Sequence, residues 1–145
     1  MQRISEFMLR DHRACDDRFA MAENAAVGHD LAAWAENHEK FRQALERHFR
    51  MEEDVLFPAF EHQTGMTSGP TEVMRSEHNQ MREAMERMAE AVADRDRDAY
   101  LGESETLLIL MQQHNIKEES VLYPMSDQAL APRAEELLEQ MSVMA

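Results

Sequence analysis

Apolar residues recur at steps of three and four along most of the chain, which is the spacing of one face of an α-helix. The first such stretch predicts a helix over about 4–26 that ends at Gly28. The second predicts a helix over about 31–62, capped at its start by Asp30. Pro58 lacks a backbone N–H, so it should bend or loosen the last turn of this helix.

The polar segment 63–70, which contains two glycines and a proline, predicts a loop in the middle of the chain. Asp98 is the expected cap of the fourth helix. Short links between four long helices predict an all-α, up-down-up-down four-helix bundle with a short C-terminal helix. The later helices are expected from Thr71 to the polar turn Arg95–Asp98, from that turn to about Met125, and from Pro132 onward.

An eleven-residue motif that begins with His48 occurs again 66 residues later, beginning with His114. Six positions are identical, and a seventh replaces phenylalanine with tyrosine. Moving His12 forward by the same 66 residues gives His78. A common offset has no reason to arise in unrelated motifs. It therefore predicts two copies of one helical hairpin, about 1–64 and 70–130, in a single domain that spans 1–145.

The composition and charge of the chain limit the classes of partner that it can bind. The 145 residues are rich in helix formers and carry a net charge of −14, which disfavours nucleic acid or an anionic membrane as a partner. Cys15, the one cysteine, cannot form an intramolecular disulfide and is expected to be a packed thiol. The longest aliphatic run, Leu107–Met111, is too short to span a bilayer. We expect a cytoplasmic protein without a membrane partner; the sequence identifies no protein partner.

The repeated residues suit a metal centre. A histidine and a glutamate four residues apart lie on one helix face, so each motif can aim an imidazole and a carboxylate at a common point. Buried carboxylates and imidazoles of this number are costly unless a cation is bound among them. The two carboxylates are placed to bridge two metal ions, and ligands without thiolate favour iron or manganese, with zinc, nickel or copper as adventitious ions. The predicted ligands are His12, His48, Glu52, His78, His114 and Glu118.

Several nearby residues have roles that the sequence leaves open. Glu53 and Glu119 should point away from the histidine of their own motif, toward a contact behind the ligands or at a helix end. Asp16 corresponds to Arg82 in the second copy; it could bind the metal, hydrogen-bond to a ligand, or form a salt bridge to an arginine such as Arg82. The methionines at core spacing are expected to pack around the centre, and the histidines without a repeat partner are assigned no role: His29, His38 and His62.

These motifs resemble the hemerythrin-like (HHE cation-binding) family over nearly the whole chain, from His12 to Glu118. The resemblance implies a four-helix bundle with a non-haem di-iron centre, oxo- or hydroxo-bridged, in which manganese or zinc could replace iron. Oxygen-carrying hemerythrins have a fifth histidine where this chain has Arg82, and they use an aspartate five residues after the last histidine. The four-His, two-Glu set looks more like the branch that acts in iron–sulfur repair and nitric-oxide stress.

The expected function is that of a di-iron protein that interacts with O2, NO or peroxide in stress response, sensing or iron handling. One alternative is a di-iron redox enzyme resembling a peroxidase or NO reductase; another is an oxygen-binding hemerythrin. A third is a binding module whose metal is purely structural. No substrate pocket or additional acid–base group is evident in the sequence, which favours a role other than catalysis.

Overall fold

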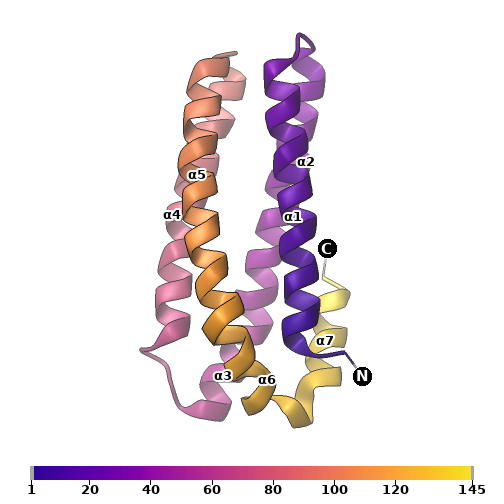
Figure 1. Cartoon of the computed structure of the whole chain (residues 1–145), viewed down its shortest axis with the longest axis vertical. Helices are drawn as coiled ribbons and strands as arrows, with labels where there is room; N and C mark the ends of the chain where they lie inside the picture. The colour runs from indigo at the N-terminus through magenta and orange to yellow at the C-terminus, as the bar shows by residue number, and fades with distance from the viewer. Residues whose placement is uncertain (1, 145) are drawn as a thin grey trace.

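The computed structural model describes residues 2–144, and all regular structure in this range is helical. The four long helices run up and down side by side, and in Figure 1 α1 lies beside α2 while α4 lies beside α5. They are α1 (Ile4–Val27), α2 (Leu31–Met51), α4 (Pro70–Ala93) and α5 (Arg97–Lys117). The predicted all-α, up-down-up-down bundle is confirmed.

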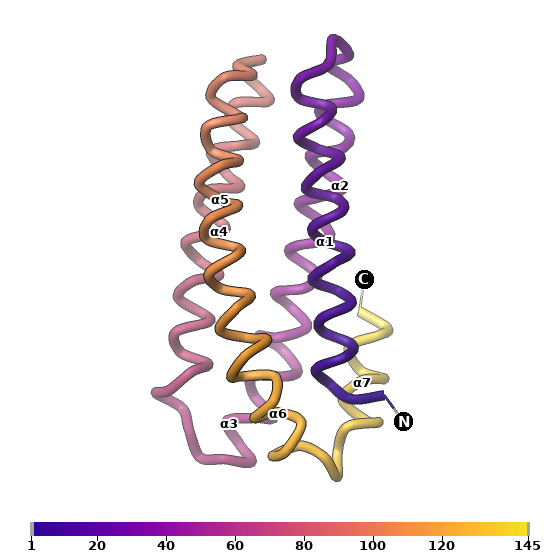
Figure 2. The backbone as a smooth tube through the Cα atoms, in the orientation of Figure 1, coloured from indigo at the N-terminus to yellow at the C-terminus, as the bar shows by residue number. Residues whose placement is uncertain are grey.

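Shorter elements close the lower part of the bundle, where the backbone trace brings α3, α6 and α7 together (Figure 2). The C-terminal helix α7 packs against α1 and against the first of two π-helical segments. No helix in the described part of the chain combines the length and apolar character needed to cross a membrane. The elements are the π segments Glu52–Leu56 and Glu118–Leu122, the helices α3 (Phe57–Thr64), α6 (Tyr123–Ala129) and α7 (Ala134–Ser142), and the 3-10 turn Ala131–Arg133.

The first helix boundary forms as predicted. Gly28 follows the last residue of α1, and the Asp30 side chain accepts a hydrogen bond from the backbone N–H of Ala33 at 3.1 Å. Such a cap satisfies one of the free N–H groups of the first helical turn.

The second boundary differs from the prediction. The cap of α5 is Asp96, whose carboxylate accepts from the Ala99 N–H at 3.0 Å, and not Asp98. The turn is tighter than expected because Arg95 adopts the left-handed conformation, with φ of 57°. The chain therefore reverses within three residues, 94–96, and α5 begins earlier.

The apolar core is divided into two clusters by one polar layer. Along α1 the lower cluster ends at Met8 and the upper cluster begins at Cys15, with His12 between them. Burial in the upper cluster raises the pKa of the Cys15 thiol to about 11, which confirms a packed thiol. The methionines expected to pack near the centre are also all buried: Met8, Met74, Met85 and Met111. The bundle thus holds its polar layer between two dry regions.

Candidate metal centre

Two π-helical segments place the carboxylates of the centre. They begin at Glu52 and Glu118, and the N–H of Phe57 donates to the carbonyl of Glu52, five residues back. Pro58 and Pro124 follow each segment and have no N–H, so the ordinary i to i−4 ladder cannot continue there. Pro58 was expected to bend or loosen the last turn of its helix; the departure from α-helical geometry instead lies before each proline and starts at the glutamates themselves.

The six predicted ligand residues meet in one buried layer of the bundle. None of their side chains is more than 4% exposed. The histidines come one from each long helix, and the glutamates come from the π segments. The layer consists of His12, His48, Glu52, His78, His114 and Glu118.

Each carboxylate lies between histidines of both halves of the chain. Oε1 of Glu52 lies 3.4 Å from Nε2 of His48 and 3.1 Å from Nε2 of His78. Oε1 of Glu118 lies at 3.0 and 3.2 Å from Nε2 of the other two histidines. A carboxylate in this position is suited to bridge two ions, each held by one pair of histidines.

The histidines form two pairs, one in each half of the chain. The first-half pair is His12 and His48, with ring centroids 4.6 Å apart, and the second-half pair is His78 and His114, at 4.9 Å. The ligand residues therefore make two adjoining groups. Glu118 belongs to both groups, because its oxygens lie close to the donor atoms of either pair.

A second ring of carboxylates holds the outer nitrogen of every histidine. Each Nδ1 lies 2.6–2.8 Å from a carboxylate oxygen, so Nδ1–H donates outward and the Nε2 lone pair faces the centre. This tautomer is the one that binds a metal through Nε2. The pairs are His12 with Glu119, His48 with Asp11, His78 with Glu53, and His114 with Glu77.

Two of these outer carboxylates, Asp11 and Glu77, were missed by the sequence interpretation. Each directly precedes a predicted ligand, and the two lie 66 residues apart. The common offset therefore marked both as part of the repeated site. The other two resolve a question that the sequence left open. Glu53 and Glu119 do turn away from the histidine of their own motif, and this direction brings them to the histidine of a neighbouring helix.

The electrostatics of the centre favour a bound cation. With Nδ1 protonated, each inward Nε2 is an acceptor that faces another acceptor, the glutamate oxygen. Nε2 of His114 and Oε2 of Glu118 are buried and have no hydrogen-bond partner among the described residues. Burial disfavours charge on His48, but the carboxylates of Glu52 and Asp11 outweigh it and raise its pKa well above the ordinary value. Without a metal, protons therefore supply the positive charge that the carboxylates require.

Tyr123 is the other residue that the sequence interpretation missed. Its hydroxyl lies 2.8 Å from Oε2 of Glu52 and 2.9 Å from Oε1 of Glu118, and so can donate to either carboxylate. It also lies 3.1 Å from Nε2 of His12. Burial and both carboxylates raise the pKa of Tyr123 well above its ordinary value, so the phenol stays protonated. The signal was the one position where an aromatic residue of the first motif, Phe57, is replaced by a different aromatic residue in the second.

Of the roles left open for Asp16, a salt bridge to Arg82 is not formed. Arg82 instead donates to both carboxylate oxygens of Glu53 at 2.8 Å and to those of Glu46 at 2.9 and 3.1 Å. Asp16 is exposed, and burial of part of its carboxyl group raises its pKa. The two halves therefore differ at the position just outside the ligand layer.

The other histidines lie outside the centre, as predicted. His29 and His62 are exposed. His38 is buried in the upper part of the bundle, where its Nδ1 lies 3.0 Å from the hydroxyl of Tyr100. Burial lowers the pKa of His38, which keeps this ring neutral.

The sequence comparisons agree with this geometry. The family model described as Hemerythrin HHE cation binding domain matches residues 3–126. The match covers all six residues of the buried layer and both π segments. No curated protein and no solved structure is significantly similar to the chain.

Proposed function

The chain belongs to the hemerythrin HHE cation-binding domain family, and from this premise we propose that it is a non-haem di-iron protein that interacts with O2, NO or peroxide. One observation carries the proposal: each of two buried carboxylates lies against the inward nitrogen of one histidine from each half of the chain. Two ions, each bound by one histidine pair, would share these carboxylates. The proposed ligands are the six residues of the buried layer.

Iron is the preferred metal on the chemistry of the donors. Four imidazole nitrogens and two carboxylates, without thiolate, suit iron or manganese better than the soft metals, and zinc also accepts this set. Bound iron would supply redox electrons and an open coordination position for a small ligand. The protein contributes the orientation of the imidazoles through the outer carboxylates, and two apolar clusters limit water around the layer.

The donor count argues against reversible oxygen carriage. The position where oxygen carriers of this family have a fifth histidine is Arg82, which points to Glu46 and Glu53 rather than to the centre. Fewer nitrogen ligands leave iron more open to oxidation. We therefore favour a role in stress response, sensing or iron handling. The lone buried thiol of Cys15 fits a reducing compartment such as the cytoplasm.

Tyr123 supports a second candidate, a di-iron redox enzyme that reduces peroxide or NO. Its protonated hydroxyl lies beside both carboxylates and could supply a hydrogen bond or a proton to a bound ligand. This candidate would be favoured if the iron-loaded wild type reduces peroxide or NO over many turnovers and the rate is at least tenfold lower in Tyr123→Phe.

Both halves of the chain are needed to form the centre, so we infer that 1–145 functions as one domain. Glu53 of the first half holds His78 of the second, and Glu119 of the second half holds His12 of the first. A hairpin on its own would lack these contacts.

Anaerobic iron loading followed by metal analysis and O2 titration tests the proposal. We expect about two irons per chain, and oxidation by O2 that is not reversed when O2 is removed. Because His78 lies in the layer and His38 does not, His78→Gln should lose bound iron and His38→Gln should retain it. A stable, reversible oxygen spectrum would instead identify an oxygen carrier, and failure to bind any transition metal would refute the centre.

A further inference from the structure

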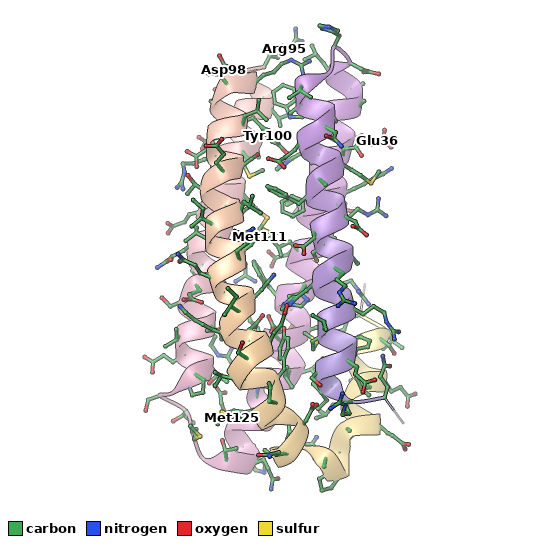
Figure 3. All side chains as sticks on the ribbon, viewed as in Figure 1. Glu36, Arg95, Asp98, Tyr100, Met111 and Met125 are labelled. Carbon is green, nitrogen blue, oxygen red and sulfur yellow. The ribbon has the colours of Figure 1, made fainter. Side chains whose placement is uncertain are left out.

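A cavity of about 500 Å³ lies between α1 and α5, against the first-half side of the centre. Phe19 and Met111 form part of its apolar wall, and Figure 3 shows Met111 on the stretch of α5 that lies beside α1. Its acidic side chains are Asp16, Glu23 and Glu119, and no basic side chain lines it. The cavity therefore combines a large opening with a concentrated negative charge.

The same place in the other half of the molecule is built differently. A cavity of about 350 Å³ lies between α2 and α4, and five of its six lining residues are the 66-residue counterparts of residues in the α1/α5 cavity. Arg82 takes the place of Asp16, and Arg42 takes the place of Leu108. Glu46 and Glu86 balance these two arginines. The repeat therefore gave two equivalent cavities, and only one of them is purely acidic.

The acidic cavity leads directly to a side chain that holds the centre. Oε2 of Glu119 lies 2.7 Å from Nδ1 of His12, and the side chain of Glu119 remains 38% exposed. Its counterpart Glu53 is 19% exposed and is covered by Arg82. Oε2 of Glu118, which directly precedes Glu119 in the chain, is buried without a partner among the described residues, so the centre itself has an unmet demand for a cation.

We propose that the α1/α5 cavity is the route by which divalent cations reach the centre, and that Arg82 closes the equivalent route between α2 and α4. This inference rests on the proposed di-metal function. An acidic cavity with apolar walls concentrates cations at its surface and raises their association rate by tenfold or more at low salt. On the opposite face, Arg82 is paired with Glu46 and Glu53, so those carboxylates have no excess negative charge to attract the same ions.

The test is the rate at which metal-free protein takes up Co²⁺, followed by its visible absorption, with anaerobic Fe²⁺ as a second probe. The variant Asp16→Asn/Glu23→Gln removes two charges from the cavity without touching a proposed ligand. We expect its uptake rate to fall about three- to tenfold at low salt, with an unchanged final spectrum and metal content. The deficit should shrink in about 0.5 M salt because the charges are screened.

Glu83→Gln/Glu86→Gln is the matched control, since it removes the same charge from α4 on the opposite side and should leave the rate nearly unchanged. Equal slowing in this control would show a general effect of net charge and overturn the route. An unchanged uptake rate in Asp16→Asn/Glu23→Gln would also overturn the proposed route. The metal centre itself would stand in that case, because the wild type and the variant would both bind metal. A wild type that takes up no metal at equilibrium would overturn both the centre and the route.

Discussion

The two halves of the molecule share one backbone plan but surround their histidines differently. The inner and outer carboxylates of one half recur in the other at matching distances. Beside the second-half pair lies the apolar ring of Phe57, with its centroid 5.7 Å from that of His78. Beside the first-half pair lies the hydroxyl of Tyr123. A repeated scaffold can therefore fix the number of ligands while single substitutions make the two metal positions unequal.

The two metal positions also differ in the side chains that could bind an ion there. Four side chains converge on the second-half position, namely Glu52, His78, His114 and Glu118. Three converge as closely on the first-half position, namely His12, His48 and Glu118, and Glu52 reaches that position only through Oε1, 3.4 Å from Nε2 of His48. We therefore expect the second-half position to bind its ion more tightly and the first-half position to remain more open to an incoming ligand.

Removing one inner carboxylate should have the largest effect, and the two glutamates should not be equivalent. Glu118 contributes to both donor groups, so Glu118→Gln should abolish stable binding at both positions. Oε1 of Glu52 lies 3.1 Å from His78 and 3.4 Å from His48, so Glu52→Gln should weaken the second-half position more than the first and leave about one metal per chain. Metal analysis after gel filtration measures this. Equal losses in the two variants would remove the proposed difference between the halves.

Acid should release the metal from both halves alike. Burial disfavours charge on His48 and His114, but the nearby carboxylates outweigh it and raise the pKa of both. In metal-free protein both rings therefore stay doubly protonated to a higher pH than a free imidazole, and each must lose one proton to bind an ion. Apparent affinity should rise up to about tenfold per pH unit for each proton released, and level off above the raised pKa values.

The stability of the metal-free protein should have the opposite pH dependence. A raised histidine pKa contributes stability that is complete below pH 6.5 and is lost as pH rises through the folded-state value. Thermal melting of metal-free and Mn²⁺-loaded protein from pH 5.5 to 8.5 measures both trends. Affinity that does not vary with pH would contradict the protonation of His48 and His114.

The fold and the ligand layer were accessible from the sequence because repetition made them visible. The 3.6-residue periodicity predicts the helices, and one offset links His12 and His78 to the two motifs. The same offset relates the outer carboxylates Asp11 and Glu77, but it does not show which histidine each of them holds. Their role depends on which helix lies beside which, and this is a property of the packed bundle.

Other features depend on local backbone geometry that a pattern of residue types does not encode. The prolines predicted a disturbance, yet not that it would be a π turn beginning at each glutamate. A salt bridge to an arginine such as Arg82 was one of the roles left open for Asp16. Arg82 lies on α4, which packs against α2, and it therefore meets Glu46 of α2 and Glu53 of the π segment that follows α2.

Removing the phenolic hydroxyl of Tyr123 should make the surroundings of the two histidine pairs more alike. It should also lower the free energy of unfolding by a moderate amount. Two buried carboxylates lose a donor in Tyr123→Phe, which should destabilise metal-free protein by about 1–3 kcal/mol. Tyr100→Phe is the matched control, because it also removes a buried hydroxyl, from His38. Denaturant unfolding should show a loss in both variants, whereas Co²⁺ spectra should change only in Tyr123→Phe. An altered spectrum in the control would mean that the spectral change reports general loosening of the bundle.

The smallest expected effect concerns the arginine that distinguishes the outer surroundings of the two halves. Arg82→Gln removes ion pairs to Glu46 and Glu53 and a contact over the Phe49 ring, 5.1 Å from the guanidinium carbon to the centroid. These groups are partly exposed, so we expect a loss of about 1–2 kcal/mol. Arg87→Gln, which breaks a single and more exposed pair, should cost less than about 0.5 kcal/mol.

The pH dependence of this loss identifies the role of Glu53. Burial opposes ionisation of Glu53, but hydrogen bonds from His78 and Arg82 outweigh it and hold its pKa at about 2. A depressed carboxyl pKa contributes stability that is present above about pH 4.5 and lost as pH falls toward 2. The difference between wild type and Arg82→Gln should therefore be largest near neutral pH and shrink in acid. A difference that persists unchanged at pH 2 would mean that Arg82 acts through its packing on Phe49 rather than by charge.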